Sequence, residues 1–214
     1  MSSKAKVKRD RIREETQRLN AKRSSLNESC AIENLIELVP IFRQFNKGEL
    51  KAQIRSFNKI PEEYEDWAFS LVKGNMKKLY EDAFGWNEEA KEADFYHENS
   101  RFLIAFYDEH PIGFIHFRFE LEGGESSLFI YDFHVEHELQ RKGLGKFLVQ
   151  AVEFMGLKLK FDSIMVSLLK DNVVARAFFR KLQYVQHPTS PIMADPENDH
   201  EYHHEILFKQ LKKN

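Results

Sequence analysis

Gln140-Arg141-Lys142-Gly143-Leu144-Gly145-Lys146-Phe147 is the stretch that decides the fold of this 214-residue chain. It stands between a strand-like segment and an amphipathic segment, residues 148–155, whose apolar residues recur at helical spacing. Two glycines allow the backbone to approach an anion, and the start of the following helix presents unpaired N–H groups. Arg141, Lys142 and Lys146 add positive charge. The stretch predicts a pyrophosphate cradle; the simpler interpretation is a glycine turn that caps a helix.

The segments around this stretch predict a mixed sheet. Three apolar, partly alternating segments separated by turns indicate an antiparallel meander, at 102–107, 112–122 and 128–135. After the glycine stretch, helix and strand patterns alternate: a helix from Gly145, a strand at 163–168, a helix at 172–181 and a strand-like pair at 184–185. This alternation favours parallel pairing. We therefore expect an α/β fold (mixed α+β), with an antiparallel meander, a strand–helix–strand–helix half and helices on both faces.

The other segments are predicted with less regular patterns. They are a short helix between Ser29 and Pro40, a strand at 50–57, an amphipathic helix from Pro61 to before Gly85, a weakly helical stretch at 88–98, a long loop at 186–199 and a last strand at 206–208.

Charge divides the chain unevenly. Residues 1–23 carry nine basic and three acidic side chains, a net charge of +6, and the remaining 191 residues carry −8. The sequence predicts a flexible basic arm at 1–23 and a folded domain at 24–214 with an N-terminal helical extension. The arm has three interpretations: nuclear import, contact with a ribosome or nucleic acid, and a solvated tail.

Composition also bears on location. Cys30 is the single cysteine, so an internal disulfide is excluded and a reducing compartment is favoured. No apolar run approaches the ~18 residues of a membrane span. We expect a monomer in the cytoplasm and nucleus, without a membrane partner.

The pattern Gln-x-x-Gly-x-Gly, after a meander and before an amphipathic helix, resembles the acetyl-CoA signature and element order of the GNAT superfamily of N-acetyltransferases. Further segments look like its NatD subfamily: Asp66–Phe69, Asn75–Met76, His116–Phe119, Arg141–Phe147 and Phe178–Arg180. The resemblance extends from about Pro40 to Leu207. NatD members acetylate the N-terminal α-amino group of histone H4 and of the histone two-A type, which begin with Ser-Gly-Arg. The resemblance thus implies a protein N-terminal acetyltransferase that uses acetyl-CoA and no metal.

The resemblance also implies where acetyl-CoA binds. The co-substrate of this superfamily lies in a V-shaped opening between the last meander strand and the next parallel strand. The residues implied for it here are Phe133, His134, Val135, Gln140, Arg141, Lys142, Gly143, Leu144, Gly145, Lys146, Phe147, Asn172 and Phe178. Asn172 is equally suited to be the N-cap of the following helix.

Two carboxylates carry the implied chemistry. Asp132 stands where NatD has Glu, and Glu120 stands where it has Asp. We expect both, with Tyr131, to be catalytic: the carboxylates engage the substrate's amine and arginine, and Asp132 or a bound water accepts the proton. Because strict alternation puts Tyr131 and Asp132 on opposite faces, a shared site requires a β-bulge, which superfamily members have on this strand. The alternative is that these are exposed strand carboxylates.

Substrate contacts follow from the same resemblance. The implied residues are Tyr80, Phe84, Glu120, Asp132, Ser167, Thr189, Tyr202 and His204. Phe84 replaces a family Trp, and either Tyr202 or His204 takes the place of a late-strand Tyr. His134 is a further candidate base, with packing as its alternative role.

Other functions remain open. His200-Glu201-Tyr202-His203-His204 matches a zinc-protease pattern, but it follows a loop and precedes a strand, so we do not expect a metal. The alternatives to N-terminal acetylation are acetylation of lysine or a polyamine, and a non-catalytic acetyl-CoA-fold adaptor bound to ribosome or chromatin through the basic arm.

Overall fold

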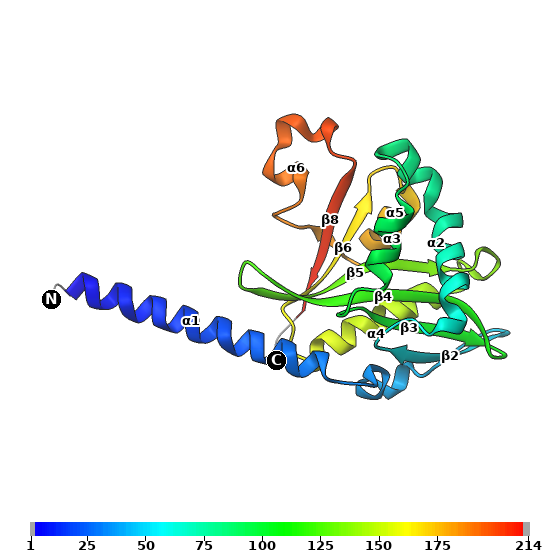
Figure 1. Cartoon of the computed structure of the whole chain (residues 1–214), viewed down its shortest axis with the longest axis horizontal. Helices are drawn as coiled ribbons and strands as arrows, with labels where there is room; N and C mark the ends of the chain where they lie inside the picture. The colour runs from blue at the N-terminus through cyan, green and yellow to red at the C-terminus, as the bar shows by residue number, and fades with distance from the viewer. Residues whose placement is uncertain (1–2, 212–214) are drawn as a thin grey trace.

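The computed structural model describes residues 3–211, and one eight-stranded sheet forms its centre (Figure 1). The strand order is β1-β2-β3-β4-β5-β6-β8-β7. The strands are β1 Gln44–Lys47, β2 Leu50–Phe57, β3 Arg101–Tyr107, β4 His110–Glu122, β5 Glu125–Val135, β6 Ser163–Leu169, β7 Val185–Gln186 and β8 His204–Gln210. Parts of the predicted arm and domain, residues 1–2 and 212–214, lie outside the described residues.

Helices cover both faces of this sheet. They are α1 Ser3–Cys30, α2 Glu62–Ala83, α3 Glu88–Phe95, α4 Leu144–Lys158, α5 Val173–Lys181 and α6 Pro191–Ala194, with short 3₁₀ turns η1 Leu35–Leu38, η2 Pro40–Phe42, η3 His137–Leu139 and η4 Pro196–Glu201. β5 and β6 pair in parallel, and the other neighbouring strands pair antiparallel. The predicted mixed α/β fold is confirmed, including the meander formed by β3, β4 and β5.

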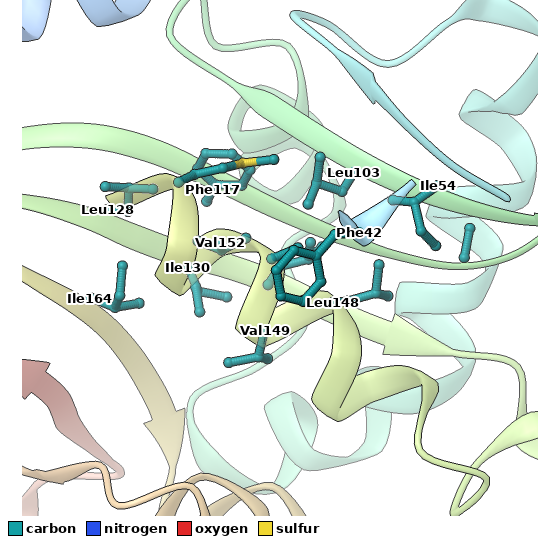
Figure 2. Close-up of a cluster of buried hydrophobic side chains, with 14 of the residues drawn as sticks. Phe42, Ile54, Leu103, Phe117, Leu128, Ile130, Leu148, Val149, Val152 and Ile164 are labelled. Carbon is teal, nitrogen blue, oxygen red and sulfur yellow. The ribbon is translucent and has the colours of Figure 1, made fainter. Parts of the chain in front are cut away.

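The sheet is buried on both sides at its centre, and β3 is apolar at every position from Phe102 to Phe106. On β3, Leu103 and Ala105 belong to the larger core, which includes α4, whereas Phe102, Ile104 and Phe106 pack with α2 and α3. Figure 2 shows part of the larger core, where residues of α4 lie against residues of the meander. The apolar run in β3 is therefore continuous because both faces of this strand are buried.

Several local predictions differ from the structure. Of the helix predicted between Ser29 and Pro40, only the 3₁₀ turn η1 forms after the end of α1 at Cys30, and Pro40, which has no N–H to continue η1, begins η2. The predicted loop at 186–199 contains α6 and most of η4. A strand that the sequence analysis left out, β1, forms a hairpin with β2 around Gly48.

The N-terminal arm is helical in the structure, and its predicted flexibility stays a prediction. α1 runs without interruption across the predicted boundary at residue 23, and it extends away from the sheet as a straight rod (Figure 1). Residues 7–18 are exposed, whereas Lys22 donates to Asp162 Oδ2 and to the Gly124 carbonyl, both at 2.6 Å. Good helix formers allow the exposed turns to continue from this anchored end. The domain boundary itself stays a prediction.

Within residues 3–211, each helix is too short or too polar to cross a membrane.

Candidate functional site

A cleft opens where the two parallel strands of the sheet separate. β5 and β6 pair only from Ser127 opposite Ser163 to Ile130 opposite Val166, although both strands continue beyond this point. The cleft between their free ends has a volume of about 420 Å³. It is lined by 129–134 of β5 and 166–169 of β6, and by residues of α2, α3 and α5. The predicted V-shaped opening is therefore present.

A β-bulge in β5 decides which side chains enter this cleft. His116 of β4 pairs with Asp132, but the next residue, Phe117, pairs with Ile130, so Tyr131 is the extra residue. A bulge shifts the alternation of side chains by one position. Asp132 thereby joins Tyr131 on the face covered by α2 and α3, as the shared site requires. The predicted bulge is confirmed.

Asp132 is the centre of a buried charged cluster. Its side chain is 3% exposed; Lys91 Nζ of α3 lies 2.8 Å from its Oδ1, and His116 Nδ1 lies 3.1 Å from its Oδ2. Burial raises the pKa of this carboxyl, but the hydrogen bond from His116, the nearby His134 ring and the charge of Lys91 outweigh burial and bring the pKa well below its usual value. For Lys91, burial lowers the pKa, but Asp132, Tyr80 and Asp94 together outweigh burial and raise the pKa above its usual value. Both groups are therefore charged at neutral pH.

Two histidines complete this cluster. Burial lowers the pKa of His116, so its ring is neutral; Nδ1 donates to Asp132, and Nε2 lies 2.9 Å from Ser100 Oγ. His134 Nδ1 lies 3.3 Å from Asn75 Nδ2 of α2, and its Nε2 lies 3.8 Å from Asp132 Oδ1. Asp132 is thus held from both sides by imidazole rings.

Glu120 joins the site through Tyr131. The Tyr131 hydroxyl donates to Glu120 Oε1 at 3.2 Å, and the Arg118 guanidinium stacks over the Tyr131 ring with its carbon 4.0 Å from the ring centroid. Arg118 also bonds Asp94, the residue of α3 one turn beyond Lys91. Glu120 lies outside the lining of the cleft. The two expected carboxylates therefore belong to one cluster but occupy different positions relative to the opening.

The glycine stretch forms the turn before α4. Gly143 is the N-cap of α4, with a φ of 101° that favours glycine, and Lys47 Nζ lies only 3.1 Å from the position a Cβ would take. A Cβ on Gly145 would lie 2.8 Å from Phe133 Cζ, so this glycine allows Phe133 to pack against the helix start. These contacts join the cradle to the cleft wall.

The side chains of this stretch divide between packing and exposure. Gln140 Nε2 donates to the Val135 carbonyl at 3.0 Å, and Leu144 is buried in the core. Phe147 packs on aromatic rings of the N-terminal half. Of the residues implied for the co-substrate, these three contribute to the shape of the site, whereas Arg141, Lys142 and Lys146 are exposed at the helix start.

Asn172 combines its two predicted roles. Its side-chain oxygen accepts from the Ala175 amide at 3.1 Å, which makes it the N-cap of α5, and it also lines the cleft. Phe178 of the same helix stacks on Phe133 with ring centroids 5.3 Å apart. The α5 side of the cleft is therefore fixed by a cap and by an aromatic pair.

The residues predicted to contact substrate separate into two groups. Tyr80, Phe84, Ser167 and His204 line the cleft with Asp132. Thr189 and Tyr202 lie outside it: the Thr189 hydroxyl contacts His187 Nδ1 at 2.7 Å, and the Tyr202 hydroxyl donates to Asp195. His204 begins β8 and lines the cleft, whereas Tyr202 precedes this strand, and which of the two replaces the family Tyr stays a prediction.

The zinc-protease pattern is not assembled on a helix. His200 lies in η4, whereas His204 begins β8, so the two histidines do not share a helical face. Among the described residues, no group of three or more His, Cys, Asp and Glu side chains is arranged to hold a metal ion.

Sequence reasoning missed the residues that surround Asp132. They are Asn75 of α2, Lys91 of α3, Ser100 before β3 and His116 of β4. One signal was available for Lys91, because it is the only lysine or arginine between Glu88 and Glu98 in an otherwise acidic, weakly helical stretch. A single cationic side chain in an acidic helical stretch can indicate a buried ion pair.

Comparison with known proteins agrees with this architecture. The chain is similar in structure to PaiA N-acetyltransferase from Thermoplasma acidophilum in complex with coenzyme A, at 18% identity and a TM-score of 0.55, over 75% of this chain and 99% of that one. It is also similar to Naa50 from Arabidopsis thaliana in complex with the bisubstrate analogue CoA-Ac-MVNAL, at 16% identity and a TM-score of 0.51, over 74% and 97%. The sequence profile of the acetyltransferase (GNAT) family matches residues 62–184, more than half of the chain. The chain therefore belongs to the GNAT family of acetyltransferases.

Proposed function

We propose that this protein transfers the acetyl group of acetyl-CoA to the N-terminal α-amino group of Ser-starting proteins, above all histone H4 and the histone two-A type. The observation that carries the proposal is the ionised Asp132 in the cleft, at the point where β5 and β6 separate. The Asp132 carboxylate is balanced by Lys91, and its oxygens can accept further hydrogen bonds from a substrate amine. The NatD-like segments named above supply the identity of that substrate.

The proposed co-substrate fits the residues around the strand ends. The start of α4 presents backbone N–H groups beside Arg141, Lys142 and Lys146, which suits a pyrophosphate. Free backbone of β5 from Tyr131 onward, unpaired with β6, can hydrogen-bond an extended pantetheine chain. When bound, acetyl-CoA supplies the activated thioester.

Asp132, Glu120 and Tyr131 are the proposed catalytic residues. Asp132 attracts and orients the amine, and Glu120 meets the arginine of the Ser-Gly-Arg terminus. Tyr131, fixed between Arg118 and Glu120, forms the surface between the two carboxylates. A non-catalytic adaptor would not need a buried charged cluster that opens into a cleft.

The substrate side of the cleft favours a chain end. The ring of Phe84, at the end of α2, lies 6.2 Å from the ring of His203, which precedes β8. These two segments therefore meet across the opening and narrow it. An extended N-terminus that begins with serine and glycine is slender enough for such an opening.

Peptide turnover tests the assignment to the α-amine. CoA release is measured with a Ser-Gly-Arg-Gly peptide and with the same peptide acetylated at its terminus. We expect release with the free peptide and only background with the blocked one, because the blocked nitrogen has no lone pair available for attack. Equal release with both would show that another group accepts the acetyl group, such as a lysine or polyamine amine.

We further propose that α1 contacts the ribosome, and that the protein acts as a monomer in the cytoplasm and nucleus. Lys8, Arg11 and Arg18 are exposed on the projecting part of α1 and lie on one helical face. Ribosomal RNA offers phosphates for such cations.

Reversing the charge of these three residues to glutamate should abolish salt-sensitive co-sedimentation with ribosomes. Peptide turnover should stay unchanged, because residues 7–18 are exposed and remote from the cleft. Co-sedimentation that survives the charge reversal would contradict the ribosomal role of α1.

A further inference from the structure

Asp94 of α3 is a carboxylate in the cleft to which the proposed reaction assigns no role. Among the lining residues that the structure describes, Asp94 and Asp132 are the two acidic ones. The Asp94 side chain is 40% exposed, whereas that of Asp132 is 3% exposed. A molecule that enters the cleft can therefore reach the Asp94 carboxylate directly, while Asp132 is enclosed by its neighbours.

The cations beside Asp94 leave its oxygens available to another partner. Arg118 Nη2 lies 3.4 Å from Oδ1, and Lys91 Nζ lies 3.9 Å from Oδ2. Both distances are longer than the roughly 2.8 Å that is usual for a hydrogen bond between charged groups. Because a carboxylate offers about four lone-pair positions, Asp94 can accept two hydrogen bonds from a planar guanidinium at the same time.

The main chain at Asp94 is held in place, which defines the position of this carboxylate. The Asp94 carbonyl accepts hydrogen bonds from Ser100 Oγ at 3.2 Å and from Arg118 Nη2. Asp94 lies in the last turn of α3, and this turn of α3 contains no basic residue. The negative end of the helix dipole therefore adds to the charge of Asp94, and both favour a cation at this place.

The charged side chains connected to Asp94 include one more acidic than basic member. They are Asp94, Glu120 and Asp132 on the acidic side, and Lys91 and Arg118 on the basic side. Glu120 is connected through Tyr131, whose ring carries the Arg118 guanidinium. One further monovalent cation, such as an arginine side chain of the substrate, would complete this charge balance.

We propose that Asp94 is a specificity-determining residue, which binds the arginine at the third position of the substrate from inside the cleft, beside Glu120. This inference rests on the proposed function. The Lys91 ammonium contacts both Asp132 and Asp94, at 2.8 Å and 3.9 Å, so the two carboxylates are close neighbours. An extended chain advances by about 3.3–3.6 Å per residue, so a terminal amine at Asp132 leaves the third side chain within reach of Asp94.

Substitutions that remove charge from the protein and from the peptide test this contact together. Asp94→Asn keeps the shape of the side chain, and citrulline in place of the peptide arginine keeps the shape of the guanidinium without its charge. We expect the wild-type kcat/KM for Ser-Gly-Arg-Gly to exceed that for the citrulline peptide by about 10- to 100-fold, the range for hydrogen bonds to a charged group. Asp94→Asn should reduce this ratio by about tenfold, while the citrulline peptide reacts within about threefold of its wild-type rate.

The ratio between the two peptides isolates the contact from folding and from chemistry. A smaller folded fraction, or a change at the neighbouring Lys91, affects both peptides alike and leaves the ratio unchanged. The matched control is Glu92→Gln, because Glu92 is an exposed acid of the same helix outside the lining of the cleft, and the ratio should stay at its wild-type value. A ratio that falls equally in Glu92→Gln would assign the effect to general surface charge and overturn the proposal.

Binding to the complex of the protein with CoA gives a readout that needs no turnover. An NMR titration measures the affinity of both peptides, and the arginine peptide should bind wild type about tenfold more tightly than the citrulline peptide but lose this advantage in Asp94→Asn. A preference for arginine that is absent from wild type, or that survives Asp94→Asn in full, would overturn the proposal even if the peptide is acetylated. Binding that depends on Asp94 without acetylation would uphold this inference and contradict the proposed function. A peptide that neither binds nor reacts would contradict both.

Discussion

Asp132→Asn is expected to lower kcat for peptide acetylation by about two orders of magnitude, which is the low end of what a positioned acid–base group contributes. The amide keeps the shape of the side chain but removes its charge. Lys91 Nζ, 2.8 Å from Oδ1, then stands in the cleft without its counter-charge and repels a cationic substrate. This effect acts on the reacting amine rather than on acetyl-CoA.

The measurement is steady-state turnover of Ser-Gly-Arg-Gly, with the KM for acetyl-CoA determined beside kcat. The KM should stay within about threefold of wild type, because the cradle at the start of α4 is untouched. Asp108→Asn is the matched control, since Asp108 is exposed in the β3–β4 turn and should tolerate asparagine at its positive φ of 46°. A folded Asp132→Asn enzyme with a kcat close to wild type would remove Asp132 from the mechanism.

Lys91→Met is expected to lower the free energy of unfolding by about 3 kcal/mol, as the loss of one partner of a buried ion pair does. The Lys91 side chain is 10% exposed and that of Asp132 3%, so water cannot replace the missing ammonium. His116 and His134 remain as partners, which is why the expected loss lies at the low end of the range for such pairs. Thermal and denaturant unfolding measure it.

The pH dependence of this loss has a definite sign. The pKa of Asp132 is lowered in the folded protein, so the carboxylate contributes stability above its unfolded pKa of about 3.9 and loses it as pH falls through the folded pKa. Without Lys91 the folded pKa rises. The difference in the free energy of unfolding between wild type and Lys91→Met should therefore be largest at neutral pH and become smaller in acid.

A double-mutant cycle separates the ion pair from packing. Lys91→Met combined with Asp132→Asn should cost less than the two single changes together, because the double variant leaves no unpaired charge. Lys73→Met is the matched control: Lys73 bonds Glu88 at 2.9 Å, also between α2 and α3, but both side chains are exposed, so stability should hardly change. If the losses of unfolding free energy in the two single variants add up to the loss in the double variant, Lys91 and Asp132 are not energetically coupled.

The fold could be predicted because its signals are local. Apolar runs bounded by Gly123–Gly124 and by 108–111 defined the meander, and the switch to helical spacing after Gly145 defined the second half. The helical state of α1 was missed, because few apolar residues precede Leu19 and the anchoring of Lys22 on Asp162 depends on tertiary contact.

The site was predicted only in part. The bulge at Tyr131 was expected from family resemblance, since the alternation of residues in β5 alone would have placed Asp132 on the wrong face. The partners of Asp132 come from α3, from β4 and from its own strand, and no short sequence pattern joins Lys91 to His116. The family resemblance predicted that Thr189 and Tyr202 contact the substrate. Local hydrogen bonds instead turn their hydroxyls toward His187 and Asp195.

The proposed function is tested most directly by one peptide that carries both kinds of amine. A peptide beginning Ser-Gly-Arg-Gly-Lys, with a free terminus, is incubated with acetyl-CoA and the protein, and tandem mass spectrometry locates the added acetyl group. We predict acetylation of the terminal α-amine, whose pKa of about 7.7–8.0 leaves roughly a tenth to a sixth of it unprotonated at neutral pH, while lysine at about 10.4 remains almost fully charged. Acetylation of the lysine, or an unmodified peptide, would contradict the assignment.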